Sequence, residues 1–371
     1  MKKQITKILF FLATFLILPG YVFASPIVSG VSGTIADGQN ITILGSGFGM
    51  SGPNVLFFDN FEGGVIGQDL KTGTSSATIG QWSSLGRVHP KYSNDTSISG
   101  TKAWKVTASL GVEDSANALI MLPNINEVFI SYWWYVPLDS PWSGEGLGSY
   151  PPNMINWKIM WMMQNNSVNS DMMMPVRVGN YWYISGNDTP YTRELVGINA
   201  PTVSKGLWKK FWFWIKDGSS NDGAVRWWEL INNGVKTLVA DNNVSTIRVG
   251  DVRKKLFVNG YTRQHDSGTM PTQMFDDIYV ATGPNAQARV EIGNVATYLS
   301  STNLAVSTIN NWSDTSISAT VRSGNFTSGQ AYLYVVDANG NVNANGYPIT
   351  FGGGMSPDTT PPTAPTGLQV N

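Results

Sequence analysis

The stretch ITILGSGFG, residues 41–49, predicts a β-strand that runs into a glycine-rich turn. Ile41 and Ile43 flank the polar Thr42, and this alternation is the pattern of a half-buried strand. The three glycines of the stretch let the backbone take positive φ in the turn that follows. The fold is therefore expected to contain strands closed by tight turns, at least at this end of the chain.

Short runs of β-branched and aromatic residues, each closed by Gly, Asn, Asp or Pro, recur along the rest of the chain. This pattern is typical of strands joined by turns, whereas apolar residues at helical spacing are almost absent. The sequence therefore predicts an all-β protein, a sandwich or a jelly roll. Clear examples of such runs are EVFISYWWYVP, NWKIMWMM, KKFWFWIKDG, AVRWWELINNG and FDDIYVATG.

The composition limits the compartment and the partners of the protein. Charged residues make up only 13% of a chain that has 14 Trp and no Cys, as in strand-rich extracellular proteins. Without disulfides, the core alone must hold the fold. Residues 1–24 contribute three of the 24 Lys and Arg, so the remaining 21 against 25 Asp and Glu give a net charge of −4 with His neutral. This charge argues against electrostatic binding to nucleic acid or to an anionic membrane.

Residues 1–24 have the pattern of a secretory signal peptide. Three lysines precede the apolar run ILFFLATFLIL, and Val22 and Ala24 occupy the small-residue positions of a cleavage site. The apolar run is too short to span a bilayer. We therefore expect a secreted or cell-surface protein with no membrane insertion after the signal is cleaved.

Two segments at opposite ends of the chain resemble the halves of one immunoglobulin-like domain. PIVSGVSGTIADGQNITILGSGFG, residues 26–49, resembles the first half of an IPT/TIG domain, with Phe48 expected to fill its small core. NNWSDTSISATVRSGNFTSGQAYLYVVDANGNVNANGYPITF, residues 310–351, resembles the second half, with Trp312 before the strand that contains Ile317. The resemblance implies an Ig-like IPT/TIG sandwich assembled from both chain ends.

The segment between these halves is large enough for a complete sandwich of its own. It begins with FFDNFEGGVIG and ends with MFDDIYVATGPNAQARVEIGN, which resemble the edges of concanavalin-like or laminin-G-like jelly-roll domains. The simplest interpretation is a larger β-jelly-roll sandwich inserted into a surface hairpin, because loop entropy grows slowly with length. This fold hosts lectins, carbohydrate-binding modules, glycoside hydrolases and polysaccharide lyases, so it does not choose among them.

The end of the chain is rich in Gly, Pro and Thr and is expected to be a linker. DTTPPTAPTGLQV also resembles the beginning of a fibronectin type III domain. The predicted organisation is therefore a signal peptide (1–24), the first IPT/TIG-like half (25–57), the jelly-roll insert (58–297), the second IPT/TIG-like half (298–353), and a linker or truncated fibronectin III start (354–371).

The aromatic strands of the insert are apolar on both faces. In KKFWFWIKDG, residues 209–218, Phe211 and Phe213 point to one face while Trp212 and Trp214 point to the other. One interpretation is a large core plus packing against the IPT/TIG-like domain. The other is that one face presents aromatic rings for stacking on sugar rings. The tryptophans considered for such ligand binding are Trp134, Trp161, Trp182, Trp212, Trp214 and Trp228.

The stretch NGYTRQHDSG contains the only arrangement that suggests catalysis. In an extended segment Tyr261, Arg263 and His265 project to one face. This trio resembles the equipment of jelly-roll polysaccharide lyases, in which a cation neutralises the uronate carboxylate while Tyr or His moves protons. Arg177 and Gln164 are the candidate neutralising partners from other strands. The alternative is a solvated hairpin end without catalysis.

Four carboxylates come from the two edges of the insert: Asp59, Glu62, Asp276 and Asp277. Terminal strands commonly pair in this fold, so the four acids are candidates for a structural Ca²⁺ site, which needs six to eight oxygens. The alternative is that they cap turns and accept hydrogen bonds. The isolated His89 has no visible partner or ligand spacing, and without Cys a zinc site is not expected.

These patterns favour a secreted or cell-surface protein that binds a polysaccharide or other surface polymer through the jelly-roll domain. A polysaccharide lyase acting by β-elimination on a uronic-acid polymer is the first alternative, and a structural or adhesive protein without a small ligand is the second. A glycoside hydrolase needs two neighbouring carboxylates. Glu229 and Glu145 have no acidic partner at strand spacing, so an enzyme would be a lyase.

Overall fold

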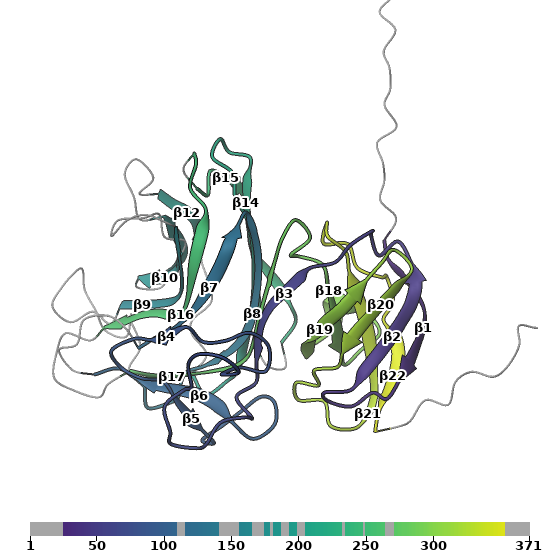
Figure 1. Cartoon of the computed structure of the whole chain (residues 1–371), viewed down its shortest axis with the longest axis horizontal. Coiled ribbons are helices and arrows are strands. Elements are labelled where there is room, and N and C mark those ends of the chain that lie inside the picture. Colours follow the sequence, from purple (N-terminus) through teal and green to yellow (C-terminus); the bar gives the residue numbers. More distant parts are fainter. Residues whose placement is uncertain are drawn as a thin grey trace, which may run out of the picture.

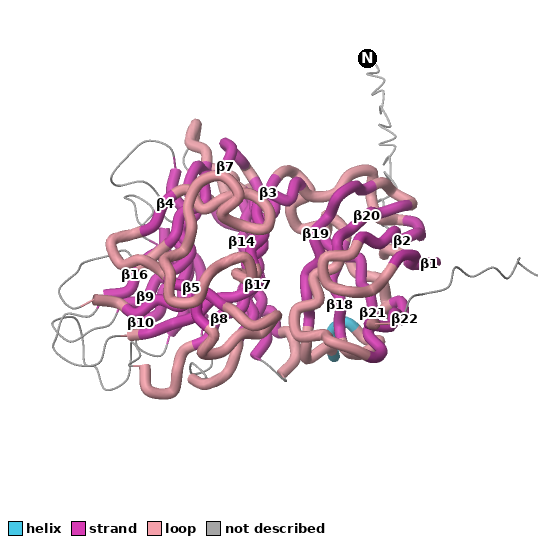
Figure 2. Tube along the Cα trace, turned by 60° about the horizontal axis from the view of Figure 1, so that its bottom comes forward, coloured by secondary structure: helices cyan, strands magenta, loops and turns pink. Residues whose placement is uncertain are grey.

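The computed structural model describes residues 25–109, 116–140, 156–164, 174–178, 181–186, 193–198, 205–231, 234–247, 249–263 and 271–352. These residues form β-strands and connecting loops, with one short 3₁₀ helix, η1 (Tyr298–Ser300), drawn in cyan in Figure 2. The all-β prediction is confirmed. In the part of the chain that the structure describes, no helix has the length and apolar character needed to cross a membrane.

One sheet joins the two ends of the chain, and we call the strands that form it the terminal domain. In Figure 1 its purple strands lie beside green and yellow ones, because β2 pairs with β20, with Ile43 opposite Ile317. In spatial order the strands are β1 (Ile27–Gly33), β2 (Asn40–Ser46), β20 (Ser316–Thr320), β19 (Leu304–Trp312), β18 (Arg289–Gly293), β21 (Gly329–Val336) and β22 (Tyr347–Phe351).

The terminal domain closes around its own core. Residues 304–307 of β19 pair with β18, whereas residues 308–312 pair with β20, so this strand links two parts of the sheet. Phe48 packs edge-on against Trp312, whose indole N–H donates to the carbonyl of Phe48 at 3.1 Å. The glycine-rich turn of residues 45–49 is therefore held by a residue more than 260 positions away.

The boundaries of the insert differ from the expected 58–297 at both ends. Strand β18 lies within that range but pairs with β19 and β21 of the terminal domain. Its Val290 and Ile292 belong to the core of that domain, and an isolated strand pattern cannot show which sheet a strand joins. At the other end, β3 (Asn54–Asp59) begins before residue 58 and pairs with β17 (Thr272–Thr282).

The central domain, from β3 to β17, is a sandwich of two antiparallel sheets (Figure 1). The outer sheet has the order β12 (Arg193–Ile198), β11 (Tyr181–Gly186), β10 (Met174–Val178), β9 (Asn156–Gln164), β16 (Arg253–Arg263), β7 (Ala118–Ile125) and β4 (Ser84–Leu85). The inner sheet has the order β15 (Thr237–Val244), β14 (Gly223–Ile231), β13 (Lys209–Lys216), β8 (Glu127–Tyr135), β17, β6 (Ala103–Thr107) and β5 (Lys91–Ser93), with β3 beside β17.

Both faces of the inner sheet are covered, which explains its aromatic strands. Phe211 and Phe213 of β13 lie in the core between the two sheets. Trp212 and Trp214 lie in a second cluster with residues of the terminal domain such as Tyr334. The structure thus confirms the interpretation of a large core plus packing against the domain built from the chain ends.

Buried charges join the two domains across this second cluster. Glu291 of β18 accepts hydrogen bonds from the indole N–H of Trp212 at 2.7 Å and from the Tyr298 hydroxyl, and its carboxylate lies 3.2 Å from Nε of Arg289. Lys236 donates to the Tyr298 hydroxyl at 2.6 Å. Burial alone would raise the pKa of Glu291, but Arg289 and Lys236 outweigh it and lower the pKa to about 2. A buried carboxylate paired in this way is costly to remove.

Candidate functional site

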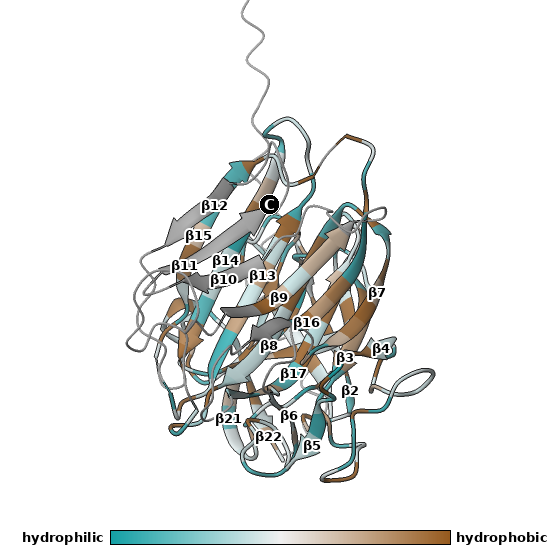
Figure 3. Cartoon of the chain, turned by 90° about the vertical axis from the view of Figure 1, so that its left-hand side faces the viewer, coloured by the Kyte–Doolittle hydropathy of each residue, from teal (hydrophilic) through white to brown (hydrophobic). Residues whose placement is uncertain are grey.

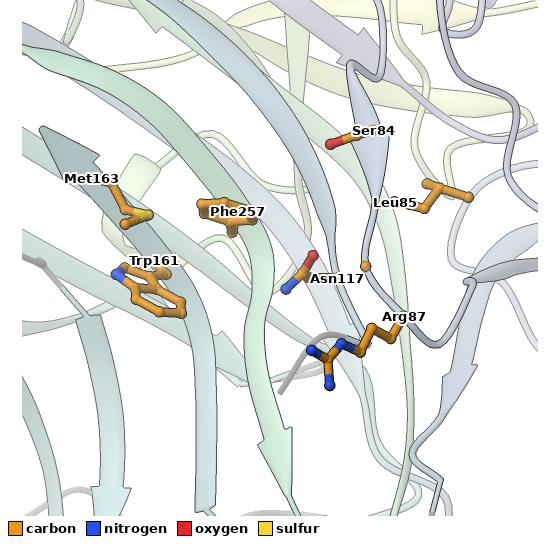
Figure 4. Close-up of a pocket in the computed structure, with 8 residues that line it drawn as sticks. Ser84, Leu85, Arg87, Asn117, Trp161, Met163 and Phe257 are labelled. Atoms are coloured by element: carbon orange, nitrogen blue, oxygen red, sulfur yellow. The ribbon is translucent and has the colours of Figure 1, made fainter. Parts of the chain in front are cut away.

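The outward face of the outer sheet carries a pocket of about 430 Å³, which we call the aromatic pocket. Figure 4 shows aromatic and polar side chains gathered around it from β4, β9, β16 and the loops beside β4 and β7. A pocket of this size suits a small molecule or one or two units of a polymer. Its lining residues are Ser84, Leu85, Gly86, Arg87, Asn117, Trp161, Met163 and Phe257.

Strand alternation places the rings of the aromatic pocket. Leu256 and Val258 are fully buried in the core, so Phe257 between them points to the opposite face of the sheet. Phe257 is the register partner of Trp161 on β9, and their ring centroids lie 5.7 Å apart. Figure 3 looks onto this sheet, with β9 and β16 side by side. Two half-buried aromatic rings therefore form a continuous surface beside an open pocket.

Polar groups lie along one side of these rings. Ser84, the first residue of β4, and Arg87, just beyond this strand, are exposed, and Asn117, just before β7, is buried. The short strand β4 pairs with β7, where Ser84 is opposite Leu119, which in turn is opposite Phe257. These residues bring a hydroxyl, a guanidinium and an amide group beside the rings of Trp161 and Phe257. Such an arrangement can stack on a sugar ring and bind its hydroxyls.

Three of the six predicted ligand-binding tryptophans lie inside the protein. Trp134 and Trp212 are 1% and 0% exposed, and Trp214 is 7% exposed. Their indole N–H groups donate to Gln273, Glu291 and Glu127 at 2.7 to 2.9 Å. Their rings therefore offer no free face to a sugar, because the core or the terminal domain occupies both sides.

The other three have different places. Trp161 lines the aromatic pocket. Trp228 is half-buried at the domain interface, with the ammonium of Lys236 5.3 Å from its ring centroid. Trp182 belongs to β11, of which the structure describes the backbone. Trp161 is thus the predicted tryptophan that the described side chains place beside a pocket.

The predicted catalytic residues are partly brought together by the outer sheet. Strand β9 lies between β10 and β16, and Trp157 is the register partner of both Arg177 and Thr262. Thr262 separates Tyr261 from Arg263, so alternation places these two residues on one face of the sheet and Arg177, which is level with Thr262, on the other. Side chains are not described at these positions, and His265 lies outside the described residues.

Gln164 does not join this group. It pairs with Arg253 at the far end of β9, seven residues from Trp157. At about 3.3 Å per residue this separation is about 23 Å along the strand. Lys158, which sequence reasoning did not consider, is instead the register partner of Tyr261.

The four acids proposed for calcium are engaged by protein donors. Glu62 accepts from the backbone N–H groups of Thr101 and Lys102 at 2.8 and 2.7 Å. Asp276 accepts from the backbone of residues 98 and 99, and Asp277 from the hydroxyl of Ser99 at 2.7 Å. Within the described residues no group of three or more His, Cys, Asp or Glu could hold a metal ion.

Asp59 is the fourth of these acids. It is 4% exposed and accepts from the indole of Trp82 at 2.8 Å and from the N–H of Phe61 at 3.0 Å. Burial raises the pKa of Asp59 to about 7 despite these two hydrogen bonds, and the charge of Asp277 adds to the rise. The structure therefore supports the alternative interpretation, in which the acids fix turns and buried donors.

Sequence reasoning missed most of the aromatic pocket. Phe257 stands in KKLFVNG, where two lysines hide the alternation of the strand. Arg87 and Asn117 are far from Trp161 in the chain and have no distinctive motif around them. The one available signal was NWKIMWMM, whose alternating Trp161 and Met163 occupy the pocket side of β9.

No model of a known protein family matches the chain, and no curated protein matches it. An endo-β-1,4-glucuronan lyase from the fungus Trichoderma reesei matches with 16% identity over 59% of this chain and 96% of its own, at a TM-score of 0.41. A variant of the alginate lyase Aly36B with a bound alginate tetrasaccharide matches with 12% identity over 63% and 98%, at a TM-score of 0.45. A GH131 β-glucanase catalytic domain from Podospora anserina matches with 13% identity over 62% and 96%, at a TM-score of 0.37. At such identities and TM-scores these likenesses carry no conclusion about activity.

Proposed function

We propose that the protein binds a polysaccharide, or another sugar polymer of a cell surface, in the aromatic pocket. The observation that carries the proposal is the pair of half-buried rings of Trp161 and Phe257, 5.7 Å apart, beside the polar groups of Arg87 and Asn117. Sugar rings present apolar C–H faces together with hydroxyls, so they match an aromatic platform with polar neighbours.

The proposal includes the setting of the pocket. The signal-like residues 1–24 support a secreted or surface-displayed protein. In that setting the terminal domain, which we propose to be of the IPT/TIG type, acts as a rigid base. Buried contacts such as Trp212 with Glu291 hold the inner sheet against it, and the outward face of the outer sheet lies on the other side of the sandwich.

Binding to a panel of neutral and acidic polysaccharides tests the proposal. We expect Trp161→Ala and Phe257→Ala to weaken binding about ten- to a hundredfold, since each removes a central aromatic contact. Trp161→Phe keeps an aromatic face and should retain most of the affinity. Leu238→Ala, which removes an exposed apolar side chain from the inner sheet, is the matched control.

Circular dichroism and thermal unfolding must show that each variant is folded. Unchanged binding in both alanine variants would show that the polymer binds elsewhere. A wild-type protein that binds none of the polymers would favour the structural or adhesive role instead.

A polysaccharide lyase is the second candidate, supported by the backbone arrangement of β9, β10 and β16. Tyr261 and Arg263 alternate onto one face of β16, and Lys158 of β9 is the register partner of Tyr261, whereas Arg177 belongs to the other face. A cation near a uronate carboxylate and a phenol for proton transfer are the groups that β-elimination requires. The unsaturated product absorbs ultraviolet light, so a uronate polymer and wild-type protein should give rising absorbance that Tyr261→Phe abolishes. If the absorbance does not rise with any uronate polymer, the lyase candidate fails and the binding function remains.

A further inference from the structure

A second pocket, of about 450 Å³, lies at the β5–β6 edge of the inner sheet. We call it the lysine pocket, after Lys91 and Lys105, which line it together with His89 and Asp95. The segment after β4 connects the two pockets: Arg87 lines the aromatic pocket and the next residue, Val88, lines the lysine pocket. One extended ligand could therefore pass along this segment and contact both.

Two cations stand directly opposite each other in the lysine pocket. Lys91 of β5 is the register partner of Lys105 of β6. Opposite residues of an antiparallel pair have Cβ atoms about 5 Å apart, and like charges in this position destabilise the sheet. Each lysine is tied to a carboxylate: Lys91 lies 3.1 Å from Asp69, and Lys105 pairs with Asp95. The two lysines thus lie side by side at the edge of the sheet, each with a carboxylate partner.

His89 adds a third basic side chain, and it has a partner that the sequence did not reveal. Its Nδ1 lies 2.8 Å from Asp69. The hydrogen bond from His89 comes first, and that from Lys91 second, in lowering the pKa of Asp69, so this carboxylate stays ionised and orients both bases. Asp69 itself does not line the pocket, and Asp95 is the acid that does. Two lysines and a histidine therefore line the pocket together with Asp95, while Asp69 pairs with His89 and Lys91 from outside the lining.

These ion pairs are weak enough to be recruited by a ligand. The side chains of His89, Lys91 and Asp69 are 51%, 57% and 47% exposed. Exposed ion pairs stabilise a fold only slightly, so an arriving anion can share the lysines at little cost. Ser93, Asn94 and Thr107 add hydroxyl and amide groups to the same lining. The pocket offers both charge and hydrogen bonds.

We propose that the lysine pocket binds an acidic group, a carboxylate or a sulfate, carried by the same polymer that occupies the aromatic pocket. The inference rests on the proposed function and specifies the chemistry of the polymer: a chain of sugars bearing negative charges. Lys91 and Lys105 hold the acidic group between them, and His89 contacts it from the adjoining segment. Arg87 lies between this group and the aromatic pocket, which it lines.

Polymers with one backbone and different charges provide the probes: dextran, carboxymethyl dextran and dextran sulfate, with alginate as a natural carboxylate polymer. The wild-type protein should bind at least one acidic polymer at least about tenfold more tightly than dextran, since hydrogen bonds to charged groups are strong. The carboxymethyl and sulfate arms show which acid is preferred. The advantage should shrink as salt is added.

The double variant Lys91→Gln/Lys105→Gln should lose this preference while keeping its affinity for dextran. Lys216→Gln, which alters an exposed lysine at the far end of β13, is the matched control and should leave the preference intact. If no acidic polymer binds more tightly than dextran, or if the double variant keeps the preference, the inference is overturned.

The aromatic-pocket variants separate this result from the proposed function. Phe257→Ala should weaken the binding of charged and uncharged polymers alike. If Phe257→Ala has no effect while the lysine variant abolishes acidic binding, the proposed aromatic site fails and the lysine pocket stands as an anion site by itself.

Discussion

The two sheets of the central domain both have an aromatic outward face, but only one of these faces is covered. On the inner sheet Trp212 and Trp214 are buried against the terminal domain and bonded to Glu291 and Glu127. On the outer sheet Trp161 and Phe257 are half-buried and border a pocket. The same residue type therefore serves assembly on one face and is available for a ligand on the other.

The difference shows that the role of an aromatic sheet face depends on what packs against it more than on the aromatic residues themselves. On the inner sheet, the indoles of Trp212 and Trp214 each donate to a carboxylate, and Arg289 and Lys236 compensate the charge of Glu291. On the outer sheet, the neighbours are exposed polar groups such as Ser84 and Arg87. On the covered face, Glu291 of the terminal domain accepts from Trp212 of the inner sheet, so the bond itself joins the two domains.

The largest expected effect comes from breaking the covered face. Glu291→Gln removes the charge that compensates Arg289 and Lys236 without changing the volume, so it should lower the free energy of unfolding by about 3–5 kcal/mol. Urea unfolding measures this, and Asp139→Asn at an exposed position is the control. If both variants cost the same, the buried network does not hold the domains together.

A pH test sharpens the contrast, because the aromatic pocket has no acid in its lining whereas Asp59, the last residue of β3 in the inner sheet, is buried. The pKa of Asp59 rises from 3.8 to about 7 on folding because of burial. A raised pKa means that its contribution to stability is fully present below about pH 4 and is lost as the pH rises through about 7. Asp59→Asn cannot titrate.

The free energy of unfolding of the wild type, relative to Asp59→Asn, should therefore fall between pH 4 and pH 8. The fall is at most about 4 kcal/mol, because each pH unit between the two pKa values is worth about 1.4 kcal/mol. Urea unfolding at a series of pH values measures the difference. A difference that stays constant with pH would mean that Asp59 remains ionised in the folded protein.

The sequence predicts the aromatic strands well but not their neighbours. Alternation alone assigns Phe211 and Trp212 to opposite faces, and the structure places them in two different clusters. Alternation cannot show that Arg289 and Glu291 are buried between the domains, because both look like solvent-facing charges in ARVEIG. Their burial depends on pairing with β21 and packing against β13, which are far away in the chain.

The candidate site was predictable only in part for the same physical reason. Trp161 stood out because tryptophans are large and the strand around it alternates. Arg87, Asn117 and Phe257 join it through the order of strands β4, β7, β16 and β9, which no local pattern encodes. Likewise, the lysines opposite each other in the lysine pocket depend on the register of β5 with β6.

The smallest effect, and the most direct comparison, comes from one substitution made on each face. Trp212→Phe removes the indole N–H from the buried carboxylate of Glu291 and leaves a cavity, so it should cost about 2–3 kcal/mol in the free energy of unfolding. Trp161→Phe should cost less than about 1 kcal/mol, because its ring is half-buried and Phe257 still packs beside it. Urea unfolding of the two variants side by side measures the contrast. Equal costs would mean that Trp161 is as fully covered in solution as Trp212, and the proposed sugar site would then have no open face.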